Sequence, residues 1–85
     1  ERGARLEDER SVHNFEERLL RYCDALGMSP REREVLELAL KGKDTQGIAT
    51  ELYISTGTVK AHMHRIYIKA GVNGRRDLAT AFWRF

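Results

Sequence analysis

Apolar residues recur at helical spacing in five stretches of the chain, and residues that start or stop helices bound each stretch. In the first stretch, residues 5–26, five apolar side chains follow one another at steps of three and four: Val12, Phe15, Leu19, Tyr22 and Leu26. This period places them on one side of an α-helix, which Gly27 then ends. The stripe spans only two to three heptads. We therefore expect it to pack against the rest of the domain, with a short coiled-coil seam as the alternative.

The second stretch begins at a strong helix start. Ser29 supplies a capping hydroxyl, Pro30 occupies the first helical position, and Glu32 stands three residues after the cap. This order of residue types is typical of a capping box. The sequence therefore predicts a helix from this point to Gly42, where a glycine ends the apolar pattern.

The third and fourth stretches predict one short helix and one longer helix. Asp44 caps the short helix, which ends near Leu52, and Gly47 in its first turn costs about 1 kcal/mol relative to Ala. We expect it to be the least stable element. Ser55 caps the longer helix, which Gly71 stops. Four of its apolar side chains share one side: Val59, Met63, Ile66 and Ala70.

The last stretch predicts a helix that begins at Asn73-Gly74 and runs through Phe85, with Asp77 in its favoured first-turn position. No stretch alternates with the period of a β-strand, so the fold class is predicted to be all-α. We expect two parts: a connector helix in residues 1–27 and a four-helix domain in residues 28–85. A chain of 85 residues can bury only one modest core.

Two helices joined by a three- to four-residue turn, as predicted around Ser55, have the layout of a DNA-reading helix-turn-helix. Beyond the turn, Lys60, Ala61, His64 and Arg65 lie opposite the apolar side of the helix. Lys60 can donate to guanine, Ala61 can touch a thymine methyl group, and His64 can hydrogen-bond a base edge. Arg65 can reach a base or a phosphate. Three hydroxyl groups near the helix start suit the phosphates of the DNA backbone: Ser55, Thr56 and Thr58.

Charge is distributed unevenly, and this is more informative than the net charge of +2. Residues 1–27 hold five bases and seven acids, and residues 28–85 hold ten bases and six acids. From Thr56 onward, six bases stand against Asp77 alone. Because each Lys or Arg that neutralises a phosphate releases condensed counterions, this distribution favours a polyanionic partner. An ordinary solvated basic face is the alternative explanation.

Residues 28–78 resemble the LuxR/GerE family of bacterial DNA-binding domains in three segments, SPREREVLEL, IATELYIS and TGTVKAHMHRIYIKAGV. The resemblance implies a four-helix module of the winged-helix-like superfamily, without a wing. Its third helix, here about residues 56–70, reads the major groove of double-stranded DNA. The resemblance places Lys60, Ala61 and His64 at base-facing positions. It places three further residues where they contact the DNA backbone or support the base-reading side chains: Thr58, Arg65 and Lys69.

The same resemblance implies how the domain is used. In that family the fourth helix often pairs two copies on a two-fold DNA site, so we expect a homodimer on DNA with RNA polymerase as a further candidate partner. Because the sequence begins at Glu1 rather than Met, we expect a segment of a longer effector-controlled regulator, such as a response regulator. Four residues are expected at or near the dimer contact: Leu78, Ala79, Phe82 and Trp83.

One segment departs from the family pattern. Thr45-Gln46-Gly47 stands where the family usually has Asn-Lys-Glu, which removes a positive charge and a capping Glu from the start of that helix. The departure weakens the case for backbone contacts from this helix.

The sequence gives no sign of a catalytic, cofactor or metal site. His62 and His64 are two positions apart, so on a helix they point roughly 200° from each other, whereas metal-binding pairs on helices need a spacing of four. The single cysteine, Cys23, is expected to be a small hydrophobe in a helix interface. No nucleophile with a base, carboxylate pair or phosphate-binding loop has supporting context. We therefore expect no enzyme activity.

A cytoplasmic protein without membrane contact is expected, because one cysteine suits a reducing compartment and no apolar run approaches the ~20 residues of a membrane span. Two alternative functions stay open. Region four of a sigma factor shares the SPREREVL and GTVK segments, but it usually continues with more arginines along its recognition helix. A protein-interaction or dimerisation module would use the stripe of residues 5–26 and the aromatic tail Phe82-Trp83-Phe85.

Overall fold

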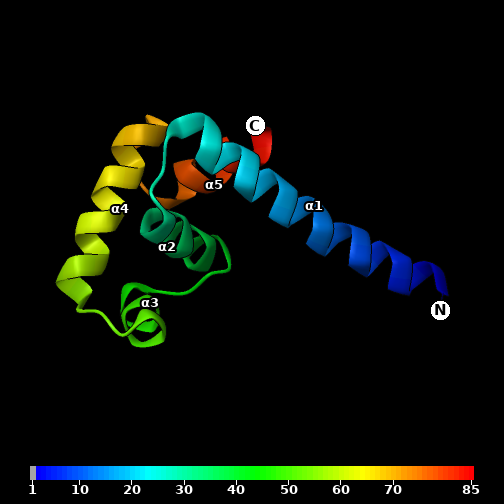
Figure 1. Cartoon of the computed structure of the whole chain (residues 1–85), viewed down its shortest axis with the longest axis horizontal. Coiled ribbons are helices and arrows are strands. Elements are labelled where there is room, and N and C mark those ends of the chain that lie inside the picture. The colour runs from blue at the N-terminus through cyan, green and yellow to red at the C-terminus, as the bar shows by residue number, and fades with distance from the viewer. Residues whose placement is uncertain (1) are drawn as a thin grey trace.

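The computed structural model describes residues 2–85, with the surroundings of side chains described for residues 14–85. Over this range the chain forms helices and no β-strand, which confirms the predicted all-α class. The helices are α1 (Arg2–Leu26), α2 (Pro30–Leu40), α3 (Thr45–Leu52), α4 (Thr56–Ala70) and α5 (Arg75–Arg84). All five predicted helices are present, close to their expected bounds (Figure 1). None of the helices in the described part of the chain is long and apolar enough to cross a membrane.

The expected residues start and stop the helices. The Ser29 Oγ accepts a hydrogen bond from the Glu32 N–H at 3.1 Å, and the Glu32 Oε1 accepts one from the Ser29 N–H at 2.9 Å. This reciprocal pair confirms the predicted capping box. The Asp44 carboxylate caps α3, and the Ser55 hydroxyl caps α4. Gly71 ends α4 with a φ of +68°, a left-handed conformation that costs glycine little.

Helix α2 lies at the centre of the fold and holds the others together. It packs against α1, α3 and α4, while α5 packs against α1 and α4. Figure 1 shows α4 on one side of α2 and α1 leading away on the other. The largest side chains that are fully buried come from four of the helices: Val35, Leu36, Ile48, Val59, Ile66, Leu78 and Phe82.

The apolar stripe of α1 joins this same core. Its described members all pack there, as predicted: Phe15, Leu19, Tyr22 and Leu26. Val12 lies outside the residues whose side chains are described. The Tyr22 ring meets the Phe82 ring edge-on at 5.3 Å between centroids, and the Phe15 ring lies 5.6 Å from the same partner. Helix α1 therefore covers one face of α5.

This packing places two of the four residues expected at or near the dimer contact in the core. Leu78 and Phe82 are 1% and 0% exposed, so both belong to the core and neither is available at the surface. Ala79 is half-buried, and Trp83 is 55% exposed with Phe15 against its ring at 6.0 Å between centroids. Only Ala79 and Trp83 remain as residues through which α5 can meet a second copy, and that role stays a prediction.

Tyr53 is an unfavourable residue for its position. It ends α3 in a left-handed conformation, with φ 57° and ψ 44°, and it is the only non-glycine residue with positive φ among those described. Its side chain is 94% exposed, so packing offsets little of the conformational cost. A residue other than glycine or asparagine pays roughly 1–2 kcal/mol to adopt this conformation.

We predict that Tyr53→Asn stabilises the fold by roughly 0.5–1 kcal/mol, because asparagine tolerates the left-handed region and the exposed ring contributes little packing. The measurement is the free energy of unfolding from chemical denaturation. Tyr53→Val is the matched control, since a β-branched residue is strained there and should lower stability. Equal stability of the two variants would contradict this account.

Candidate nucleic-acid interface

The helix-turn-helix consists of α3, a turn over residues 53–55, and α4. The two helices pack together, and the Ile54 N–H donates to the Ala49 carbonyl oxygen at 3.0 Å, which closes the turn. Val59, Met63 and Ile66 are buried, as their spacing predicts. The inward face of α4 therefore fixes its rotation about its own axis, and the opposite face is left to solvent.

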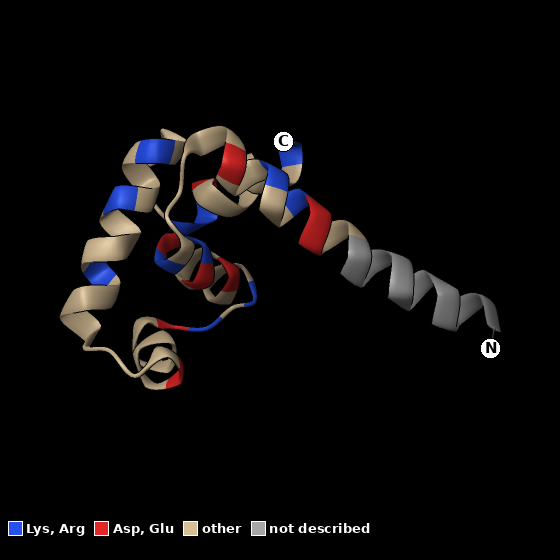
Figure 2. Cartoon of the chain, in the orientation of Figure 1, with Lys and Arg blue, Asp and Glu red and all other residues tan. Residues whose placement is uncertain are grey.

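That outer face carries the predicted DNA-contacting residues. The base-facing candidates Lys60, Ala61 and His64 are all exposed, and Arg65 is exposed beside them. Figure 2 shows basic and no acidic residues along α4, where the three cations are Lys60, Arg65 and Lys69. The structure thus brings the base-facing candidates onto one solvent-facing, positively charged surface.

The three hydroxyl groups at the start of α4 differ in availability. The Ser55 and Thr58 hydroxyls lie 2.9 Å apart and hydrogen-bond each other, and the Ser55 Oγ also accepts the Thr58 N–H at 3.1 Å. Both residues are exposed, whereas Thr56 is half-buried. Ser55 is therefore primarily the cap of the helix, and Thr58 offers the more accessible side chain.

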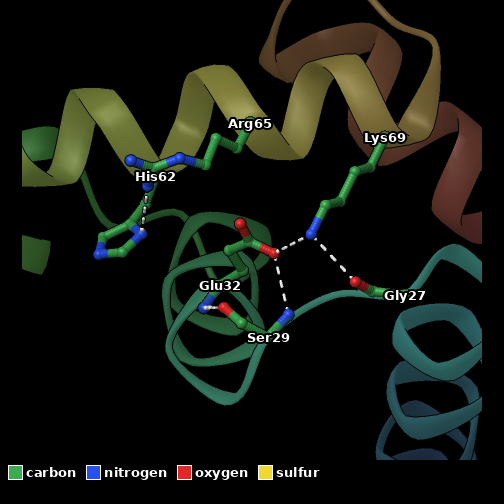
Figure 3. Close-up of polar contacts among 6 residues, drawn as sticks. All are labelled: Gly27, Ser29, Glu32, His62, Arg65 and Lys69. Carbon is green, nitrogen blue, oxygen red and sulfur yellow. Dashed lines mark hydrogen bonds and ion pairs between the residues drawn. The ribbon is translucent and has the colours of Figure 1, made fainter.

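Arg65 has a neighbour on its own helix. Its Nη1 lies 3.4 Å from the His62 Nδ1, one turn earlier on α4 (Figure 3). His62 is half-buried and points away from the outer face on which His64 lies, as their spacing of two predicts. The contact holds the Arg65 guanidinium along the flank of α4, beside the base-facing candidates.

Lys69 is exposed but has partners within the fold, and its expected role at the DNA backbone or in support of the helix stays a prediction. Its Nζ donates to the Glu32 Oε1 at 2.7 Å and to the Gly27 carbonyl oxygen at 3.0 Å (Figure 3). The Glu32 side chain is only 5% exposed, and that of Lys69 is 33% exposed. Lys69 is therefore bonded to Glu32 and Gly27 while its side chain stays partly exposed, and these bonds support the position of α4.

The electrostatics of Glu32 follow from these contacts. Burial alone raises the pKa of a carboxyl group, but the hydrogen bonds from Lys69 and Ser29 outweigh it, so the pKa of Glu32 lies below its ordinary value. The carboxylate is thus charged at neutral pH and accepts hydrogen bonds from two donors, the Lys69 Nζ and the Ser29 N–H.

Cys23 is buried in the core, as expected for a small hydrophobe. Burial raises the pKa of its thiol to about 11, so the thiol is protonated at neutral pH.

A hollow that the sequence analysis did not identify lies beside the outer face of α4. It has a volume of about 310 Å³ and is lined from three helices by Thr45, Lys60, Met63, His64, Tyr67 and Arg75. The spacing of Lys60, His64 and Tyr67 on one helix was available as a signal, since steps of three and four share a side. The approach of Thr45 and Arg75 from other helices was not, because it depends on tertiary packing.

Comparison with known proteins agrees with this geometry. The sequence profile of the family described as bacterial regulatory proteins, luxR family, matches residues 26–82. The spore germination protein GerE of Bacillus subtilis is 48% identical over 57 residues, which cover 67% of this chain and 77% of that protein. The probable transcriptional regulatory protein NarL of Mycobacterium tuberculosis is 48% identical over 48 residues, 56% of this chain and 22% of that protein.

A third relative, the transcriptional regulatory protein DesR of Bacillus subtilis, is 42% identical over 59 residues, 69% of this chain and 30% of that protein. This chain thus spans less than a third of the length of DesR and of the Mycobacterium protein. No solved structure matches the chain significantly.

We predict that Lys69→Met lowers the free energy of unfolding by about 1–3 kcal/mol, because it leaves a buried carboxylate without its cation while the partial exposure of Lys69 limits the loss. Lys43→Met is the matched control. It removes an ion pair with Glu51 at 3.7 Å in which both side chains are about half exposed, and it should cost less than about 0.5 kcal/mol.

The pH dependence separates this ion pair from simple packing. Because the pKa of Glu32 is lowered in the fold, the contribution of the pair is complete above the ordinary glutamate pKa of about 4.3 and is lost as the pH falls through the lowered value. The stability difference between wild type and Lys69→Met should therefore shrink in acid. A difference that is constant from neutral pH to about pH 3 would rule out the ion pair as its cause.

Proposed function

The chain belongs to the luxR family of bacterial regulatory proteins, whose shared domain is a DNA-binding helix-turn-helix, and we propose that it binds double-stranded DNA sequence-specifically through α4. The observation that carries this proposal is the outer face of α4, which is exposed, basic and free of acids over its whole length. A helix with such a face fits the major groove, where base edges differ in their donors and acceptors.

The residues divide into two roles in this proposal. Lys60, Ala61 and His64 read bases, because they lie on the exposed face near the middle of the helix. Residues near the helix start and along its flank bind phosphates, which orients the domain without selecting sequence: Ser55, Thr56, Thr58, Arg65 and Lys69. Binding rather than catalysis is the proposed activity.

The proposed setting is the output end of a longer cytoplasmic regulator. Residues 1–27 act as the connector and residues 28–85 as the DNA-binding domain, although the core packing of α1 ties the end of the connector to that domain. Two copies pair on a two-fold DNA site through α5, with Ala79 and Trp83 as the contact residues. RNA polymerase is a further proposed partner, in keeping with regulation of transcription.

Fluorescence anisotropy with a random-sequence DNA duplex across a salt series tests the proposal. We expect log affinity to fall linearly with log salt, with a slope of about −0.9 for each phosphate that the protein neutralises. Circular dichroism on the same samples establishes that the protein is folded. If folded protein shows no binding at roughly 50 mM salt, the proposal fails and an interaction or dimerisation module becomes the better explanation.

We predict that Lys60→Ala weakens binding to a duplex selected from a random pool by about 1–3 kcal/mol, because it removes a donor to a base edge. It should also relax base preference at one position of the site, which repeated selection with the variant measures. The exposed Lys43, outside α4, provides the comparison, since Lys43→Ala should leave base preference unchanged. An equal loss on every duplex for Lys60→Ala would contradict its base-reading role.

A further inference from the structure

The hollow between α3, α4 and α5 has features of a binding site for an oxyanion. We propose that it holds one phosphate group of the DNA backbone, next to the bases that α4 contacts. This inference rests on the proposed function and adds to it a phosphate contact built from residues of three helices. Two of the base-facing candidates, Lys60 and His64, line the hollow, which places it at the edge of the proposed reading surface.

The chemistry of the lining favours an anion. Lys60 and Arg75 bring permanent positive charges, and Thr45 and Tyr67 bring hydroxyl donors. His64 adds a ring nitrogen that can donate. No carboxylate lines the hollow among the described residues. A phosphate group there lies among potential donors from three helices and meets no like charge in the wall.

Arg75 is held in place by the fold. Its Nη1 donates to the Lys43 carbonyl oxygen at 2.5 Å, in the loop that precedes α3. This bond links the start of α5 to the start of α3 and uses one of the five N–H donors of the guanidinium group. The remaining donors are available to a ligand. Because the group is already oriented, binding a phosphate costs little side-chain entropy.

The two helix starts beside the hollow differ in their charge environment. Thr45 is the first residue of α3 and Arg75 the first residue of α5, and both line the hollow. The Asp44 carboxylate is bonded to the Gly47 N–H at 2.7 Å, while the cap of α5 has no side-chain hydrogen bond. Asp77 lies in the first turn of α5 but does not line the hollow. The partial positive charge at the start of α5 therefore reinforces Lys60 and Arg75, whereas the Asp44 carboxylate offsets that of α3.

A purely structural role is the competing explanation, in which Arg75 only ties α5 to the loop before α3. The two explanations differ in salt dependence. A residue that neutralises a phosphate changes the slope of log affinity against log salt, whereas a structural residue changes stability and leaves the slope of the folded protein unchanged. Arg76 provides the matched control, because it is the neighbouring arginine, is exposed, and does not line the hollow.

The experiment compares wild type, Arg75→Gln and Arg76→Gln by anisotropy on a selected duplex and on a random duplex across the same salt series. We expect Arg75→Gln to reduce the salt slope by about one and to weaken binding to both duplexes by the same factor. Arg76→Gln should change the slope much less. Unfolding by denaturant establishes that each variant is folded under the binding conditions.

Tyr67→Phe keeps the test decisive if Arg75→Gln does not fold. It removes one hydroxyl donor from the hollow and leaves the ring, which packs partly against the core, in place. We expect a several-fold loss of affinity on both duplexes with no change in midpoint of unfolding. Unchanged affinity for Tyr67→Phe, together with an unfolded Arg75→Gln, would overturn the proposal.

Two-dimensional NMR of the ¹⁵N-labelled protein distinguishes a DNA phosphate from a free one. We expect the duplex to shift the amide signals of Thr45 and Arg75, and inorganic phosphate alone to shift them only weakly. Saturation by inorganic phosphate, with no effect of Arg75→Gln on the salt slope, would make a free anion the ligand and overturn the DNA assignment. If wild type binds no duplex, the proposed function itself fails. If wild type binds but Arg75→Gln and Arg76→Gln behave alike, only this inference fails.

Discussion

The bond between Glu32 and Lys69 is the constraint on which the orientation of the DNA-binding surface depends. One carboxylate, 5% exposed, caps the start of α2 through Ser29 and accepts the ammonium group at the end of α4. The same ammonium group donates to the Gly27 carbonyl oxygen, where α1 ends. Three helices therefore meet at one charged pair. Because removing either partner leaves an uncompensated charge, the arrangement is costly to break.

This anchoring separates the cations of α4 into two groups. Lys69, at the end of the helix, is used inside the fold, whereas Lys60 and Arg65 lie on the outer surface. The positions of these basic residues along the helix do not reveal this division, since the sequence predicts a DNA contact or supporting role for all three. Arg75 is a second cation with a bond inside the fold. Its bond to the Lys43 carbonyl oxygen, in the loop before α3, holds the guanidinium group beside the hollow that α3, α4 and α5 line.

Helix α1 determines how much of α5 is available to a second molecule. Tyr22 and Phe15 pack against Phe82, and this removes from the surface an aromatic side chain that otherwise suits a dimer interface. Trp83, on the next position of α5, stays 55% exposed. The described part of α1 is thus part of the core, and the exposed apolar surface of α5 is narrower than its sequence indicates.

The sequence by itself determined every helix of this protein and the side of α4 that faces solvent. Caps such as Ser29 and Asp44 act on residues within one turn, and the spacing of Val59, Met63 and Ile66 defines an inward face without reference to the rest of the chain. The exposure of Lys60, Ala61 and His64 could be predicted from this spacing, because they lie on the opposite side of the same helix.

Only the tertiary structure decided which charged and aromatic residues are used within the fold. Lys69 and Glu32 are 37 positions apart, and Arg75 and Lys43 are 32 positions apart, so no helical period relates them. The burial of Leu78 and Phe82 likewise depends on where α1 packs, which their own helix does not specify. Helix caps and apolar spacing involve only neighbouring turns of one helix, so the sequence shows them directly. Ion pairs and hollows between helices form only where several helices meet in the folded chain.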